Sequence, residues 1–170
     1  FRKPLIIMSP KSLLRHPKVI SGWDEFTKNN FQEILPDPKM RDPKTVETLI
    51  LCSGKLYYDL DLARDDKYKN SSNIAVVRVE QLYPFPRTQL TPYLNGFPKL
   101  KRVIWAQEEP KNMGAASHIM PKIATLLEEL GLKKLDFVYI GRTERASPAT
   151  GSHHNHQHEQ QEIVDACFQP

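Results

Sequence analysis

A glutamine and two glutamates interrupt an apolar stretch in the second half of the chain. Gln107, Glu108 and Glu109 directly follow residues 102–106, a run with the composition of a buried strand. Adjacent carboxylates in such a place are compatible with acid–base chemistry, a metal site or a polar contact with another chain. Because neighbouring side chains of an extended chain point to opposite faces, the two glutamates do not form a self-contained acid–base pair. The spacing therefore favours a structural or interface role.

The residues from 141 to 151, GRTERASPATG, supply basic partners for such a role. A guanidinium can hold a carboxylate through two parallel hydrogen bonds, so Arg142 is a candidate partner for Glu108 or Glu109. Two solvated arginines, Arg142 and Arg145, are the alternative. With Asn112, which lies in the turn after the glutamates, we predict an interface or polar cluster made of Gln107, Glu108, Glu109, Asn112 and Arg142.

Two further patterns suggest a ligand but are incomplete. Ser53-Gly54-Lys55 resembles half of a phosphate-binding loop, yet the glycine expected five residues upstream is missing and Leu56 follows the lysine. An anion at the start of a helix and an ordinary strand-to-helix turn both remain open for this segment. His154 and His158 have a spacing that presents two imidazoles on one helix face, but the spacing supplies no third ligand. We therefore predict no metal site.

From residue 46 onward, strand patterns alternate with helix patterns. The sequence predicts strands at 46–52, 74–79, 103–106 and 137–140, and helices at 55–64, 87–94, 114–130 and 157–168. This alternation is typical of a three-layer α/β/α fold with a mostly parallel sheet. Ligands of such sheets gather outside the carboxyl ends of the strands, where residues 53–55, 80–82 and 107–109 should converge.

The first 44 residues are less regular. Residues 5–8 are an apolar run that predicts a short strand, which we expect at an antiparallel edge of the sheet. Residues 18–44 contain several prolines and little periodicity, so we predict an irregular segment wrapped on the surface, pinned by Phe26, Phe31, Ile34 and Leu35. A bare connection of that length is unusual inside a compact domain, which is compatible with its being held by another chain or domain.

Composition limits the classes of partner. The chain has 170 residues, a hydrophobic fraction of 39% and a formal charge of +4. The length is enough for one domain with a real core, and the hydrophobic fraction excludes a disordered tail. The basic residues are scattered among acids and no apolar run approaches membrane-spanning length, so we expect neither nucleic acid nor membrane as a partner. Cys52 and Cys167 form no CxxC pair, which fits a reducing compartment.

Several blocks of the sequence resemble, in order, the carboxyl-terminal end of 2-oxoglutarate dehydrogenase. They are RKPLIIMSPKSLLRH, LILCSGKLYYDL, VRVEQLYPFP, WAQEEPKNMGA, and ASPATG followed by EQQEIVDACF. The resemblance covers nearly the whole chain, although Met113 stands where glutamine is expected. It implies a fold similar to the transketolase carboxyl-terminal domain, with a mixed five-stranded sheet whose edge strand is antiparallel. It also implies that residues 1–170 are one such domain, cut from a longer enzyme.

The resemblance implies an activity for the full enzyme. That enzyme belongs to the tricarboxylic acid cycle and uses thiamine diphosphate and Mg²⁺ to decarboxylate 2-oxoglutarate. It passes the succinyl group to the lipoyl arm of the dihydrolipoyl succinyltransferase component, and the cofactor carries the carbanion chemistry. The diphosphate and metal motif of the family, GDG followed by an asparagine, does not occur in this sequence. We therefore expect no catalytic or cofactor-binding residues in this sequence. The resemblance also implies a protein of the bacterial cytoplasm or, in a eukaryote, of the mitochondrial matrix.

Two roles for this part of the enzyme follow. The first is an assembly domain that contacts the rest of its own chain and a second subunit of a homodimer. The second is an autonomous regulatory module that binds an acyl-CoA or a nucleotide, since actinobacterial relatives have a regulatory acetyl-CoA site involving this domain. Gln81 and Arg87 are our tentative positions for a comparable anion site.

Overall fold

The structure is a computed structural model that describes residues 2–169. The chain divides into two compact units, with the boundary between Phe31 and Gln32. The amino-terminal unit contains a 3₁₀ turn, η1 (Lys11–Leu13), and a short helix, α1 (Trp23–Thr27). The remaining helices and strands belong to the second unit, which holds the core.

The strand predicted at residues 5–8 does not form. These residues have no assigned secondary structure, and their side chains are between 72% and 91% exposed. The apolar composition indicated a strand, but a strand is stable only when a neighbour pairs with its backbone and packs on its side chains. The pinning role predicted for Phe26 and Phe31 is also wrong, because these rings are 74% and 67% exposed.

The second unit is built on a five-stranded sheet in the order β1-β3-β2-β4-β5. Its strands are β1 (Ile34–Leu35), β2 (Thr48–Cys52), β3 (Ile74–Val79), β4 (Arg102–Pro110) and β5 (Asp136–Arg142). Only β1 is antiparallel to its neighbour, and the other pairs are parallel. The predicted mixed, mostly parallel sheet is confirmed, but its antiparallel edge lies at 34–35 and not at 5–8.

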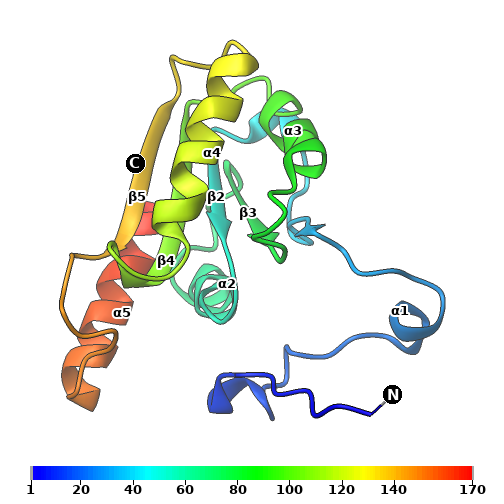
Figure 1. The fold of residues 1–170 in the computed structure, drawn as a ribbon. Helices are drawn as coiled ribbons and strands as arrows, with labels where there is room; N and C mark the ends of the chain where they lie inside the picture. The colour runs from blue at the N-terminus through cyan, green and yellow to red at the C-terminus, as the bar shows by residue number, and fades with distance from the viewer. Residues whose placement is uncertain (1, 170) are drawn as a thin grey trace. The chain divides into compact units, whose positions relative to one another are not determined.

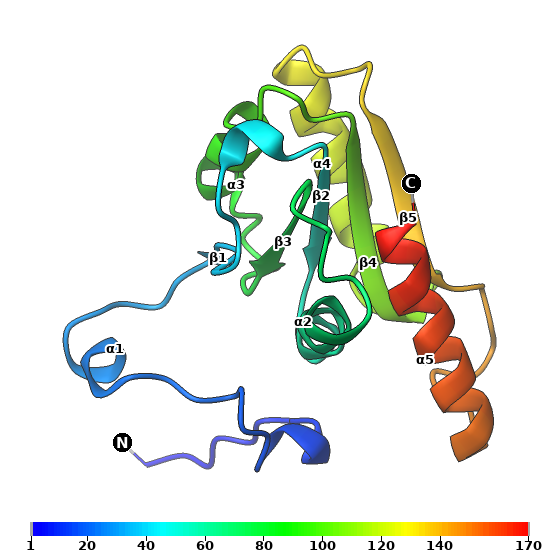
Figure 2. The ribbon, with the colours of Figure 1, turned by 180° about the vertical axis from the view of Figure 1, so that it is seen from behind.

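Helices cover both faces of this sheet, as Figure 1 and, from behind, Figure 2 show. They are α2 (Leu56–Asp66), α3 (Arg87–Asn95), α4 (Ala116–Glu129) and α5 (His153–Phe168), and a 3₁₀ turn, η2 (Pro43–Thr45), precedes β2. Helix α5 begins four residues before its predicted start. The Ser152 hydroxyl accepts a hydrogen bond from the Asn155 N–H there, which is a typical helix cap.

Strand alternation explains the two hydrophobic layers. Along β2, Leu49 and Leu51 belong to the core cluster under α3 and α4, whereas Ile50 and Cys52 belong to the cluster under α2 and α5. All four side chains are fully buried, as expected for a central parallel strand with helices on both faces. Trp105 of β4 is the largest fully buried side chain and lies in the α3–α4 layer.

A buried ion pair holds the segment after β1 against the core. The carboxylate of Asp37 accepts hydrogen bonds from both terminal nitrogens of Arg64 on α2, at 2.6 and 2.8 Å. It also accepts from the main-chain N–H groups of Val76, at 2.9 Å, and Lys39, at 2.8 Å. Asp37 and Arg64 are only 4% and 7% exposed. Together with Ile34, this aspartate fixes a stretch for which the sequence predicted only apolar anchors.

Candidate functional site

Strand β4 continues further than predicted and carries the glutamates with it. Gln107, Glu108 and Glu109 lie inside the strand, next to an irregularity in its pairing with β5 between Ala106 and Pro110. Their predicted position beyond the strand end is therefore wrong, because a bulge lets the pairing resume at Pro110. The two carboxylates do diverge, since Glu108 meets Lys55, whereas Glu109 packs beside Gly114 of the following turn.

Gln107 joins β4 to the start of α4. Its side-chain oxygen accepts from the indole N–H of Trp105, at 3.0 Å, and from the main-chain N–H of Ala116, at 2.9 Å. Its amide nitrogen donates to the carbonyl oxygen of Met113, at 2.8 Å, and to two more carbonyls at 3.2 Å. Gln107 is 3% exposed, so these bonds saturate a buried amide. They make Gln107 a positioning residue of the fold.

Asn112 makes a second connection between loops. Its amide donates to the carbonyl oxygen of Arg145, at 2.9 Å, and its oxygen accepts from the N–H of Arg145, at 3.1 Å. This two-sided pairing holds the turn after β4 against the loop after β5. Asn112 therefore contributes to loop position through main-chain contacts.

Lys55 and Gln160 link helices α2 and α5 to Glu108. The Lys55 ammonium lies 2.8 Å from both Asp59 Oδ2 and Glu108 Oε2. The Gln160 amide donates to the same two oxygens, at 2.9 and 3.1 Å. Partial burial acts to lower the pKa of Lys55, but its hydrogen bonds to Asp59 and Glu108 raise the pKa above its ordinary value. The lysine of the SGK segment is thus committed to two carboxylates.

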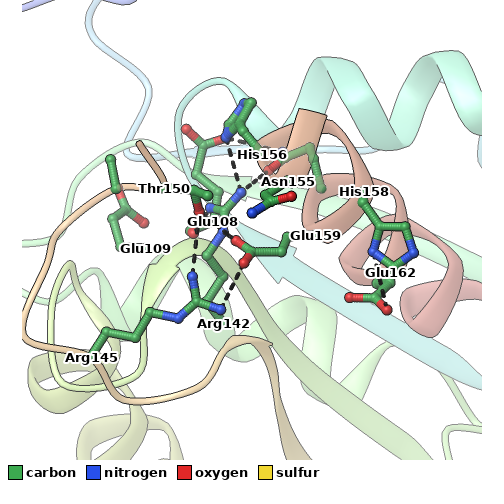
Figure 3. Close-up of polar contacts among 12 residues, drawn as sticks. Glu108, Glu109, Arg142, Arg145, Thr150, Asn155, His156, His158, Glu159 and Glu162 are labelled. Atoms are coloured by element: carbon green, nitrogen blue, oxygen red, sulfur yellow. Dashed lines mark hydrogen bonds and ion pairs between the residues drawn. The ribbon is translucent and has the colours of Figure 1, made fainter. Parts of the chain in front are cut away.

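Arg142 is buried and makes several polar contacts with residues of β4 and α5, which Figure 3 shows. Its Nε donates to Glu159 Oε2 at 2.7 Å, and its terminal nitrogens reach the main-chain oxygen of Glu108 and, at 3.2 Å, the side-chain oxygen of Gln160. The carboxylate that pairs with Arg142 is therefore that of Glu159. The expected pairing with a carboxylate of Glu108 or Glu109 is wrong, because Glu108 offers its carbonyl group.

Glu159 is the carboxylate that joins Arg142 to the loop after β5, and the sequence did not indicate this role. Besides Arg142, its carboxylate contacts Arg145 Nη2 at 2.7 Å and accepts from the Thr150 hydroxyl at 2.6 Å. These hydrogen bonds, led by that of Arg145, lower the pKa of Glu159 to about 2. Glu159 belongs to the EQQE sequence at the start of the last amphipathic stretch, where no local pattern relates it to Arg142.

The network balances its own charge. Its positive members are Lys55, Arg142 and Arg145, and its negative members are Asp59, Glu108 and Glu159. Three charges of each sign leave no excess to attract an ion from solution. The contacts tie α2, β4, β5 and α5 together at the carboxyl edge of the sheet, and we call these six residues with Gln160 the strand-end network.

The structure does not bring Gln81 and Arg87 onto a common partner. The Gln81 amide donates to the carbonyl oxygen of Pro84 at 2.9 Å, within its own turn. Arg87 begins α3 and forms an ion pair with Glu129 of α4. The guanidinium of Arg87, predicted to bind an anion, is therefore already paired with the carboxylate of Glu129.

One member of the histidine stretch contacts the strand-end network, because Nδ1 of His156 lies 3.2 Å from Nη2 of Arg142. His158 is exposed and its Nδ1 lies 3.5 Å from Glu162 Oε1, one helical turn away. Residues 2–169 contain no group of three or more His, Cys, Asp or Glu that could hold a metal ion. Within the same residues, no helix is long and apolar enough to cross a membrane.

Cys52 and Cys167 are buried free thiols, and burial raises the pKa of Cys167 to about 12.

Comparison with known proteins decides the family. The family described as 2-oxoglutarate dehydrogenase C-terminal matches residues 20–168. The chain belongs to this family. Three relatives are 2-oxoglutarate dehydrogenase E1 components. That of Rickettsia felis is 45% identical over 164 residues, covering 96% of this chain and 16% of the relative. That of Azotobacter vinelandii is 41% identical over 171 residues, covering 98% and 17%, and that of Shouchella clausii is 45% identical over 163 residues, covering 95% and 17%.

The extent of these matches separates two parts of the chain. Every member of the strand-end network, and Gln107, lies within the residues assigned to the 2-oxoglutarate dehydrogenase C-terminal family. Residues before 20 lie outside that family region, but the E1 alignments cover 95% to 98% of the chain and so extend into them. The chain spans only 16% to 17% of the length of these relatives.

Proposed function

We propose that the chain is the carboxyl-terminal lobe of a longer 2-oxoglutarate dehydrogenase E1 polypeptide. That polypeptide would convert 2-oxoglutarate to CO₂ and a succinyl group that passes to the lipoamide of the succinyltransferase component. The observation that carries the proposal is an alignment over 95% to 98% of this chain with about one sixth of several E1 components. The lobe would contact the rest of its own chain and a second E1 subunit.

The proposed contribution of the lobe is structural. The polar groups at the carboxyl edge of the sheet already hold one another, with ion-pair distances of 2.7 and 2.8 Å. A reacting group placed there would have to break such pairs before Glu108 or Glu159 could exchange a proton with it. A carboxylate whose pKa is about 2 is also a poor base near neutral pH. These features favour a rigid lobe over a reaction centre.

The residues of this lobe do not fit the cofactors of the full enzyme. Mg²⁺ takes oxygen ligands in octahedral geometry, usually one or two carboxylates together with phosphate groups and water. The carboxylates of the strand-end network are engaged with lysine, arginine and glutamine side chains. We therefore assign thiamine diphosphate and Mg²⁺ to the part of the polypeptide outside this chain.

A domain-replacement experiment tests this proposal. The matched region of the Rickettsia felis E1 component is replaced by this chain, and 2-oxoglutarate-dependent CO₂ release is measured with thiamine diphosphate and Mg²⁺ present. We expect the chimera to keep activity and the same E1 without the matched region to lose it. The isolated chain should release no CO₂ and give no heat with the cofactor in titration calorimetry. An inactive chimera that folds and forms dimers would overturn the proposal, and so would CO₂ release by the isolated chain.

One cavity favours the second candidate, a small-molecule module. A cavity of about 500 Å³ is lined by Arg41, Lys69 and Ile74, among others. Ile74 is the first residue of β3, so this cavity lies at the amino ends of the strands, whereas Gln81 and Arg87 follow the carboxyl end of β3. Binding here predicts a thermal shift with millimolar acetyl-CoA or AMP that is lost in Arg41→Ala and kept in Arg87→Ala. The absence of any shift would remove this candidate.

A further inference from the structure

The amino-terminal arm, which we define as residues 5–31, exposes an unusual amount of apolar surface. It holds ten of the twelve large hydrophobic side chains that are exposed among residues 2–169, and the other two are Leu62 and Tyr83. The ten are Leu5 83%, Ile6 81%, Ile7 72%, Met8 91%, Leu14 74%, Val19 37%, Ile20 81%, Trp23 80%, Phe26 74% and Phe31 67%. Apolar surface of this extent marks an interaction site.

The arm has no core of its own. Its only α-helix, α1, is five residues long, far below the length at which a helix is stable in water by itself. No residue from 2 to 31 is classed as buried. The arm therefore acquires a defined packing only when another surface covers it.

The composition of residues 5–8 indicates the kind of surface. Leu5, Ile6, Ile7 and Met8 are consecutive apolar residues, so their side chains would point to both sides of an extended backbone. A run of this kind is typical of a strand that is covered on both faces, as β2 is in this structure. An edge strand with one wet face would alternate apolar and polar residues.

The alignments indicate the occupant. Residues before 20 lie outside the C-terminal family region, but the alignments with E1 components extend into them. About five sixths of the length of those relatives has no counterpart in this chain. We propose that the arm docks on the preceding part of the E1 polypeptide, where residues 5–8 add a strand to a sheet and the aromatic residues at 23, 26 and 31 cover an apolar surface. This inference rests on the proposed function.

Limited proteolysis tests the docking. Trypsin can cut the arm after Arg15 and Lys28, which are exposed in this structure. In the isolated chain, we expect both cuts well before any cut inside residues 32–169. In the chimera with the Rickettsia felis E1 component, the same cuts should be slower by at least about tenfold, since cleavage follows the population of the undocked arm. Equal cleavage rates in both proteins would overturn the inference.

Paired substitutions separate docking from folding. Ile6→Asp combined with Ile7→Asp should restore fast cleavage at Arg15 in the chimera and lower its melting temperature. The same pair should leave the melting temperature of the isolated chain unchanged, because both side chains are exposed there. Ser21→Asp combined with Asn29→Asp is the matched control, with equal added charge at exposed polar positions of the arm, and should leave the chimera protected.

The outcomes distinguish this inference from the proposed function. An active chimera with a freely cleaved arm would overturn the docking and leave the proposed function standing. A protected arm in an inactive, folded chimera would overturn the function and leave the docking standing. If the isolated chain forms a stable dimer whose arm resists trypsin, the occupant is a second copy of this chain and the inference is wrong.

Discussion

The buried pair of Asp37 and Arg64 gives the sharpest test of how the second unit is held together. Asp37→Ala removes four hydrogen bonds and leaves a guanidinium whose side chain is only 8% exposed without its carboxylate. Breaking such a pair by removing one partner typically costs about 3 to 5 kcal/mol, because a buried charge is left uncompensated. Asp61 Oδ1 lies 3.8 Å from Arg64 Nη2 and offsets part of the loss. We therefore expect a loss of about 3 kcal/mol in the free energy of unfolding.

Urea unfolding followed by circular dichroism measures this loss. Asp37→Asn keeps an acceptor oxygen and should lose less, about 1 to 2 kcal/mol. Asp24→Ala is the control, because Asp24 pairs with Lys28 at 3.1 Å with both side chains about 70% exposed, and it should cost under about 0.5 kcal/mol. Combining Asp37→Ala with Arg64→Met should cost less than the sum of the two changes. A loss below about 1 kcal/mol for Asp37→Ala would refute the reasoning.

Three further predictions concern the site and the thiols. Gln107→Glu should lower the free energy of unfolding by about 2 kcal/mol in urea, because the carboxylate still accepts two bonds but faces three carbonyl oxygens without a donor. Glu159 has its pKa lowered from 4.5 to about 2, chiefly by Arg145, so its stabilisation is complete above pH 4.5 and is lost as pH falls towards 2. Glu159→Gln should therefore cost about 1 kcal/mol at pH 7, discounted for its exposure, and the difference from the parent should shrink below pH 4.5 in urea titrations. Cys52 and Cys167 should react with a thiol reagent only at the rate of unfolding, since burial raises both pKa values, and fast labelling in the folded protein would contradict their placement.

The sequence predicted the part of the fold that depends on local pattern. Apolar runs without alternation located β2 and β3, and the spacing of apolar residues located α2, α3 and α4 to within two residues at each end. These signals are strong because a strand covered on both faces and an amphipathic helix each leave a periodic pattern. Convergence of Lys55 and Glu108 also followed from local pattern, since parallel strands end at one edge of the sheet.

The parts that the sequence missed depend on contacts between distant residues. Asp37 lies 27 residues from Arg64, and the residues around it carry prolines and no periodicity. Glu159 lies 17 residues from Arg142, and only the docking of α5 on the sheet decides that it takes the place expected of Glu108 or Glu109. The short strand β1 has two residues, which is too short for any alternation to be read.

The contrast between the two units carries the functional argument. In the second unit, the charged groups at the strand ends satisfy one another, and a lobe of this kind has little chemistry to offer at that edge except a fixed shape. In the arm, ten large apolar side chains lie exposed to solvent. In most protein–protein association, the removal of apolar surface from water is the dominant favourable contribution. We therefore propose that this chain recognises its partner through residues 5–31, and that the strand-end network keeps the lobe rigid.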